Sequence, residues 1–269
     1  MKFVYPQGKA KALTLSYDDG QIYDRRLVEI FNQNGLKGTF HLNSGKLGFD
    51  NEWDHHVTKE EIVKLYAGHE VACHGEHHRT LHNVSEPQAI LEILEDRRAL
   101  EQITGGLVMG MSYAYGHYNQ RIKELIRSVG IKYSRTVNST GGFFPPADFL
   151  EWNPTCHHGY RLIELAKQFL QIPDYVDMPL MYVWGHSFEF DRADNWELIE
   201  EFARLVGGKE DIWYATNMEI CDYITATRSQ EYSADGMTMH NPTIYSVWVK
   251  TAQGVQEVKP GETKFLGER

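Results

Sequence analysis

Two adjacent aspartates, Asp18 and Asp19, end an apolar run and are followed by Gly20. Neighbouring residues on a strand point to opposite sides, so two carboxylates that leave a strand can take different roles. One can bind a metal ion while the other reaches a substrate as a base. The same residues also fit an ordinary Asp-Gly turn after a strand.

A second group consists of closely spaced histidines. The chain has 13 histidines, and His74 and His78 lie four residues apart in the segment His-Gly-Glu-His-His. In a helical turn this spacing puts both imidazoles on one face, as in His-Glu-x-x-His zinc sites, although Glu76 does not directly follow the first histidine. Two imidazoles and an aspartate at neighbouring strand ends make a common metal-site composition, and a polar loop is the alternative.

Further candidate residues follow other apolar runs. Residues 113–117 form an aromatic turn with Gly116, whose backbone can offer an N–H to a developing negative charge. His186 closes an apolar run, a position that also suits a histidine of the barrel rim. Trp152 and Trp184 are candidates for an aromatic wall against a sugar or an acyl group, and core packing explains them equally well.

The elements that position these residues alternate between short apolar runs and amphipathic stretches. The predicted strands are 12–17, 38–42, 70–73, 107–113, 131–134, 149–152, 180–184 and 212–215. The predicted helices between and after them include 23–34, a long helix from 85 to 105, 119–129, 160–170, 195–206 and 218–226. Repeated β-then-α units predict a parallel sheet in a (β/α) barrel, whose chemistry sits at the carboxyl ends of the strands.

The pattern changes after Arg228. Residues 244–250 alternate between apolar and polar side chains, and residues 256–259 follow a turn at Gly254. We therefore expect a barrel over residues 1–228 and a β-hairpin extension packed on it over residues 229–269.

The amino-acid composition disfavours some classes of binding partner. The 269 residues carry 37 acidic and 27 basic side chains, a net charge of −10, which disfavours nucleic acids and anionic membrane surfaces. No apolar run reaches the 18 residues of a membrane span. Three scattered cysteines and an amino terminus without a signal-peptide pattern lead us to expect a cytoplasmic protein.

In this order and spacing, the motifs resemble those of the polysaccharide deacetylases of carbohydrate esterase family 4, the NodB-homology group, over about residues 10–227. The resemblance implies a distorted (β/α)7 barrel. It also implies that Asp19, His74 and His78 bind a divalent metal, usually zinc. A carboxylate with two imidazoles accepts cobalt, nickel or iron as well.

The same resemblance implies the catalytic roles. Asp18 is expected to be the base, His186 the general acid, and the backbone N–H of Tyr115 a donor to the oxyanion. Trp152 is expected to contact the substrate. The implied reaction is removal of an N-acetyl group from a saccharide. The alternatives are an amidase or O-acetyl esterase acting on a small molecule, and an inactive sugar-binding barrel.

Two motifs depart from the family pattern. Ser112 stands where the family has an arginine that pairs with the catalytic aspartate, and we hypothesise that Arg135, at the end of the next strand, replaces it. The acid that tunes the catalytic histidine is expected in the fourth motif, where either Asp148 or Glu151 fits.

Overall fold

The computed structural model describes residues 1–267, so the last two residues of the predicted carboxy-terminal extension lie outside it. A curled parallel sheet carries the fold, in the order β6-β5-β4-β3-β2-β8-β7, with β9 paired to the start of β2. Its strands are β2 (Lys11–Asp18), β3 (Gly38–Leu42), β4 (Glu70–Cys73), β5 (Gly110–Ser112), β6 (Tyr133–Arg135), β7 (Cys156–His157), β8 (Leu180–His186) and β9 (Ile212–Tyr214). The prediction of a distorted barrel of parallel strands is confirmed.

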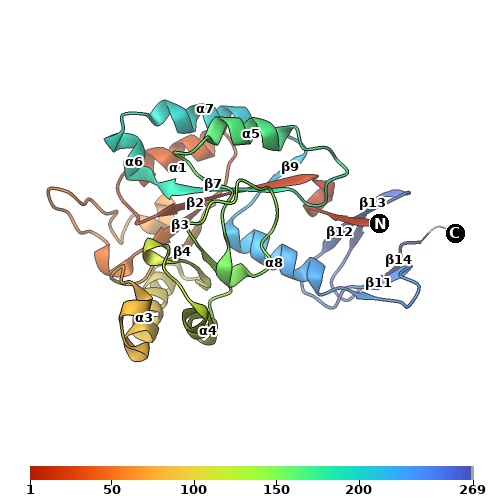
Figure 1. The fold of residues 1–269 in the computed structure, drawn as a ribbon, viewed down its shortest axis with the longest axis horizontal. Coiled ribbons are helices and arrows are strands. Elements are labelled where there is room, and N and C mark those ends of the chain that lie inside the picture. Colours follow the sequence, from red (N-terminus) through yellow and green to blue (C-terminus); the bar gives the residue numbers. More distant parts are fainter. Residues whose placement is uncertain (268–269) are drawn as a thin grey trace.

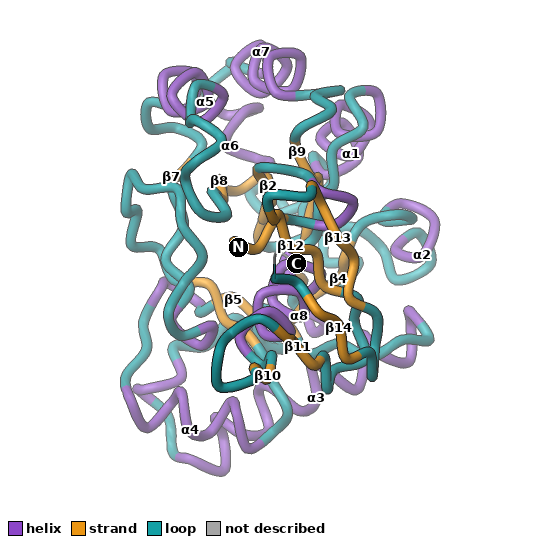
Figure 2. Tube along the Cα trace, turned by 90° about the vertical axis from the view of Figure 1, so that its right-hand side faces the viewer, coloured by secondary structure: helices purple, strands orange, loops and turns teal. Residues whose placement is uncertain are grey.

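Helices surround this sheet, as Figures 1 and 2 show. They are α1 (Asp24–Gln33), α2 (Ile62–Leu65), α3 (Glu86–Thr104), α4 (Gln120–Ser128), α5 (Leu162–Leu170), α6 (Ser187–Arg192), α7 (Trp196–Val206) and α8 (Asn217–Arg228). The longest, α3, begins at the capping residue Ser85, whose N–H donates to Gln88, and ends at Gly105 with a φ of 71°. Within residues 1–267, no helix is long and apolar enough to cross a membrane.

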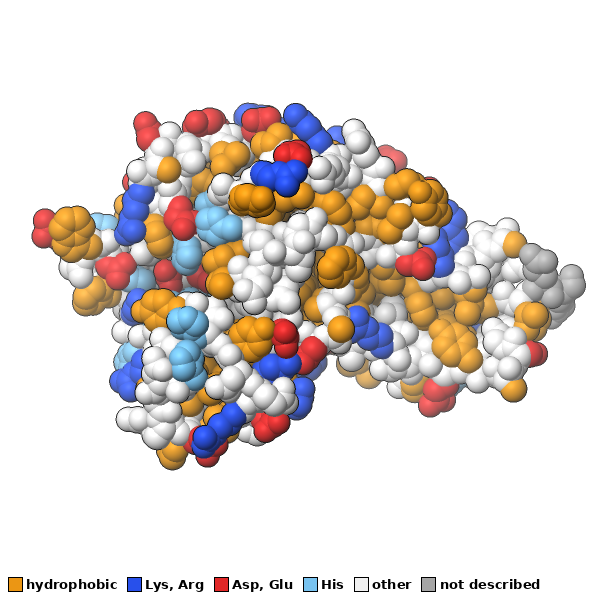
Figure 3. Space-filling model, viewed as in Figure 1, with side chains coloured by type: hydrophobic (Ala, Val, Ile, Leu, Met, Phe, Trp, Pro, Cys, Tyr) orange, Lys and Arg blue, Asp and Glu red, His pale blue; other side chains and the backbone are white. Residues whose placement is uncertain are grey.

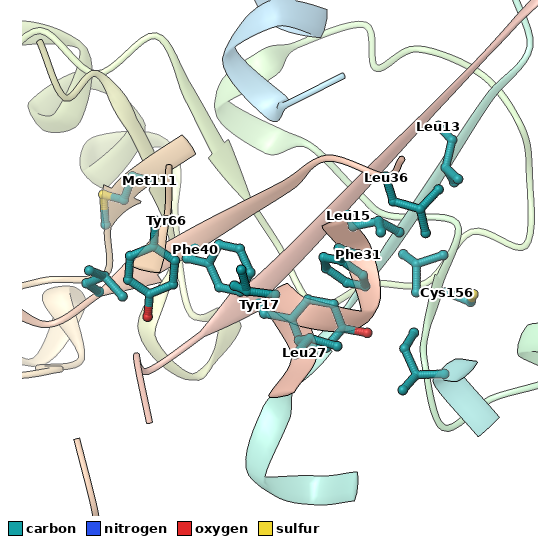
Figure 4. Close-up of a cluster of buried hydrophobic side chains, with 14 of the residues drawn as sticks. Leu13, Leu15, Tyr17, Leu27, Phe31, Leu36, Phe40, Tyr66, Met111 and Cys156 are labelled. Carbon is teal, nitrogen blue, oxygen red and sulfur yellow. The ribbon is translucent and has the colours of Figure 1, made fainter. Parts of the chain in front are cut away.

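The main core lies between the sheet and the helices on its outer face. Every residue of β2 is buried, and β2 pairs with β3, β8 and β9. Leu15 and Tyr17 of β2 pack with Phe31 of α1 and Phe40 of β3, as Figure 4 shows. Because β2 is fixed by this packing, the carboxylates at its end have a defined position.

Small antiparallel sheets complete the fold. Their strands are β1 (Lys2–Val4), β10 (Glu231–Tyr232), β11 (Thr238–His240), β12 (Val247–Thr251), β13 (Gly254–Val258) and β14 (Thr263–Phe265). The hairpin β12–β13 lies where the alternating pattern predicted strands. It also pairs with β1 from the amino terminus, so the appended sheet contains residues from both ends of the chain.

The predicted strand over 149–152 is wrong. Residues Phe149–Glu151 form a 3-10 turn, because the Asp148 side chain accepts a hydrogen bond from the Leu150 N–H at 2.9 Å. The chain then runs extended, bonding β6 through Trp152 and β8 through Thr155. This segment joins the two edges of the curled sheet.

Candidate active site

The side chains with metal-ligand chemistry meet at the carboxyl ends of the parallel strands. Asp18 ends β2, His74 follows β4, and His186 ends β8. Figure 3 shows histidine and acidic side chains gathered in the left-hand part of the face in view. Parallel strands end at one edge of a sheet, so residues far apart in sequence become neighbours there.

Asp19, His74 and His78 converge on one point. Asp19 Oδ1 lies 3.6 Å from His74 Nε2 and 3.7 Å from His78 Nε2, and the two Nε2 atoms are 3.0 Å apart. Ligand atoms held at about 2.0–2.2 Å around a tetrahedral ion lie roughly 3.3 Å from one another. The three atoms therefore have the spacing of metal ligands.

The surroundings of these atoms fit a cation. Asp19 Oδ1 is buried and has no hydrogen-bond partner among the described residues. Asp19 and His78 both have left-handed backbones, with φ of 78° and 58°. Such conformations are unfavourable for most residues other than glycine and cluster at functional sites.

The tautomer of His74 suits a metal ligand. Its Nδ1 lies 3.0 Å from the carbonyl oxygen of Ser112 and 2.7 Å from Ser112 Oγ. A carbonyl only accepts, so Nδ1 carries the proton and the lone pair of Nε2 faces Asp19. Burial lowers the pKa of His74 to about 3, which keeps the ring neutral.

Asp18 sits beside these ligands in a fully paired environment. Its carboxylate contacts Arg135, accepts a hydrogen bond from Ser112 Oγ at 3.2 Å and lies 3.3 Å from His41 Nδ1. Burial by itself would raise the pKa of Asp18, but Arg135 and the neighbouring imidazoles of His74 and His41 hold it well below the usual range. Asp18 is therefore ionised near neutral pH.

His186 lies across the site from Asp18. Its Nε2 is 4.0 Å from Asp19 Oδ2, while its Nδ1 is 3.2 Å from Glu189 Oε1. Burial would lower the pKa of His186, but Glu189 and the nearby aspartates Asp18 and Asp19 outweigh it and raise the pKa above its ordinary value. The charged imidazolium is thus favoured.

Tyr115 forms part of the rim. It lies in the 3-10 turn Ala114–Gly116 with a φ of 59°, and its ring is 4.4 Å from that of His78. The side chain is 61% exposed. The ring offers a flat apolar surface next to the metal ligands.

Three predicted site residues lie elsewhere. Trp152 is 1% exposed and packs against Tyr133 and Tyr182, so it does not form a wall against substrate. Asp148 and Glu151 both pair with Lys123 of α4, at 2.7 and 2.9 Å, instead of approaching His186. The 3-10 turn, absent from the sequence prediction, directs these side chains away from the site.

Two neighbours of the site escaped the sequence reasoning. His41 belongs to the wholly buried strand β3 and gives no pattern of its own. Glu189 is three residues after His186 on the helix that begins there, a spacing that brings side chains together and was available as a signal.

A curled parallel α/β sheet with this cluster at its carboxyl edge defines a NodB-type barrel protein. Residues 6–134 match the family model described as polysaccharide deacetylase. The amino-terminal part of the chain thus matches the polysaccharide deacetylase family, whose members are generally metal-dependent deacetylases. No curated protein matches the chain.

Solved structures agree on the fold. A protein described as a polysaccharide deacetylase from Mycobacterium smegmatis has a TM-score of 0.62 at 18% identity, covering 85% of this chain and 95% of its own. A second, from Pseudomonas aeruginosa PAO1, has a TM-score of 0.63 at 16% identity, covering 81% and 91%. Puue allantoinase has a TM-score of 0.62 at 13% identity, again covering 81% and 91%.

Proposed function

We propose that this protein is a metal-dependent hydrolase that removes the acetyl group from the nitrogen of an N-acetylated saccharide. The observation that carries the proposal is the placement of an ionised carboxylate and a charged imidazole on either side of three converging ligand atoms. Groups whose pKa values are pushed apart in one site mark the base and the acid of a hydrolytic reaction.

Asp19, His74 and His78 would hold the metal, with zinc the first expectation and cobalt, nickel or iron the alternatives. When bound, such an ion polarises the acetyl carbonyl and lowers the pKa of water. One carboxylate and two imidazoles leave coordination positions for water and substrate.

Asp18 is the base in this proposal. Because Arg135 holds its carboxylate ionised and oriented, Asp18 accepts a proton from the attacking water. The arginine expected at position 112 is supplied by Arg135, which supports a working enzyme over an inactive sugar-binding barrel.

His186 is the acid. Its Nε2 side faces Asp19, and the proton it carries passes to the nitrogen of the departing amine. An amide nitrogen leaves very poorly unless it is protonated. The Tyr115 backbone N–H donates to the negative charge that develops on the acetyl oxygen.

The substrate is a neutral sugar that becomes cationic when its acetyl group is lost. A protein with a net charge of −10 favours such a product over an anion. With Trp152 buried, the exposed ring of Tyr115 offers an aromatic surface beside the ligands for stacking against a sugar.

A small-molecule amidase is the second candidate, and the fold likeness to Puue allantoinase favours it over an O-acetyl esterase. To separate the two, the zinc-loaded protein is incubated with N-acetylglucosamine oligomers and, separately, with allantoin. We expect equal amounts of acetate and primary amine from the oligomers. Turnover of allantoin without acetate release from the oligomers would assign the site to the amidase class.

A further inference from the structure

Behind His186, a second cluster joins Glu189 of α6 to His157 and His158 at the end of β7. Glu189 Oε2 lies 3.0 Å from His157 Nε2 and 3.1 Å from His158 Nε2. The other carboxylate oxygen, Oε1, lies 3.2 Å from His186 Nδ1. One carboxylate thus meets three imidazoles, which we call the Glu189 cluster.

Within this cluster, the composition of Glu189, His157 and His158 suits a second metal site, since one ligand atom from each lies within 4.8 Å of the others. The tautomer of His157 argues against one. His157 Nδ1 accepts a hydrogen bond from the Gly159 N–H at 3.1 Å, so the proton of a neutral ring sits on Nε2. That nitrogen donates to Glu189, whereas His74 has the opposite arrangement.

His158 has the same tautomer for a different reason. Burial lowers its pKa, so the ring is neutral and carries one proton. Its Nδ1 is buried with no hydrogen-bond partner among the described residues, and it packs so closely on Gly185 that a Cβ there would collide with the ring. The proton therefore belongs on Nε2, where Glu189 accepts it.

Glu189 is consequently an acceptor for several N–H groups. Oε2 receives the two imidazole N–H groups and the backbone N–H of His186 at 3.3 Å. Burial would raise the pKa of Glu189, but the hydrogen bonds from the three histidines lower it, so the carboxylate stays ionised. Because these contacts hold Oε2, the other carboxylate oxygen, Oε1, has a defined position next to His186.

We infer that Glu189, held by His157 and His158, is the positioning residue for His186 and takes the role expected of the fourth-motif acids. Its Oε1 lies 3.2 Å from His186 Nδ1 and pairs with that side of the imidazolium ring, so that Nε2 faces Asp19. The inference rests on the proposed function, in which His186 protonates the departing amine. Glu189 acts through His186 and does not touch the reacting atoms.

The test compares two acetyl donors that differ in the need for an acid. An N-acetylglucosamine oligomer has an amine leaving group that must be protonated, whereas 4-nitrophenyl acetate releases a stable anion without help. For E189Q we expect kcat on the oligomer to fall about 10- to 100-fold and kcat on the ester to change less than about 2-fold. H157A changes a half-exposed residue, so it should lower the ratio of kcat on the oligomer to kcat on the ester by less than E189Q does.

The matched control is E151Q, an acid of the predicted fourth motif that pairs with Lys123. It should leave both rates unchanged. Equal losses on the two substrates in E189Q would show a merely structural role and overturn the inference. Both rates are measured on the same protein sample, so the fraction of unfolded protein cancels in their ratio.

A second measurement needs no activity. The ¹⁵N shifts of the imidazole nitrogens should place the protons of His157 and His158 on Nε2 and a proton of His186 on Nδ1. An unprotonated Nε2 in His157, or binding of a second zinc equivalent that perturbs this ring, would contradict the inference. A wild-type protein that turns over neither donor but shows these tautomers would defeat the proposed function alone.

Discussion

The Arg135 guanidinium contacts the Asp18 carboxylate although β6 and β2 are separated by three strands in the sheet. The curl of the sheet brings the two strand ends together, and the guanidinium also lies 4.1 Å from the centre of the Trp184 ring. Both charged side chains are buried, at 0% and 2% exposure. In a buried ion pair of this kind, removing one charge leaves the other unpaired in the protein interior at a large cost in stability.

Removal of Arg135 should therefore destabilise the protein through the charge left behind. We expect R135M to lose about 3–5 kcal/mol of unfolding free energy in urea, because Asp18 remains as a buried anion. The double variant D18N/R135M should regain much of that loss. If the two single effects simply add, Arg135 and Asp18 are not energetically coupled.

Ser112 should affect metal affinity without being a ligand. Its Oγ lies 2.7 Å from His74 Nδ1 and donates to Asp18 at 3.2 Å, so it helps orient both side chains. For S112A we expect zinc affinity to fall about 10-fold, measured by competition with a chromophoric chelator. The Ser112 carbonyl still holds His74, so complete loss of zinc would contradict this account.

Metal binding should depend on two histidines and not on the one between them. H74A should bind less than about a tenth of the zinc bound by the wild type, because it removes a buried ligand nitrogen. H77A is the matched control, since His77 lies beside Glu76 on the exposed side of the same turn. Equal zinc content in the two variants would refute the ligand assignment.

Asp24 should make stability depend on pH. Burial raises its pKa to about 7, while Ser187 and Tyr66 donate hydrogen bonds that act in the other direction. The folded protein thus holds this proton more tightly than the unfolded chain. The resulting stabilisation is complete below about pH 4 and is lost as the pH rises through about 7.

D24N imitates the protonated carboxyl group and should remove this dependence. Between about pH 4 and pH 8, the unfolding free energy of the wild type should fall by up to about 4 kcal/mol relative to D24N. The measurement is urea unfolding across this range, with chelator present so that metal binding does not contribute. Parallel curves for the two proteins would contradict the prediction.

The sequence predicted those parts of the site that follow from sheet geometry. The closeness of the Asp19, His74 and His78 side chains could be predicted because parallel strands end at the same edge of the sheet. The replacement of the missing arginine by Arg135 follows because that residue ends the adjoining strand.

The remaining features depend on contacts that no local pattern records. Asp148 and Glu151 are drawn away by Lys123, a residue of a different helix. The strand β1 was not predicted because its partner, β12, lies at the other end of the chain. Glu189 had the right spacing from His186, but its contacts with His157 and His158 at the end of β7 become visible only in the fold.

The most direct test of the account is acetate release measured against bound zinc. Chelated wild-type protein is titrated with zinc in the presence of N-acetylglucosamine oligomers, alongside D18N. Acetate release by the wild type should rise to a plateau at one equivalent per chain. D18N should bind the same equivalent and release acetate at least about 100-fold more slowly. Acetate release that is independent of zinc, or equal in D18N, would contradict the account.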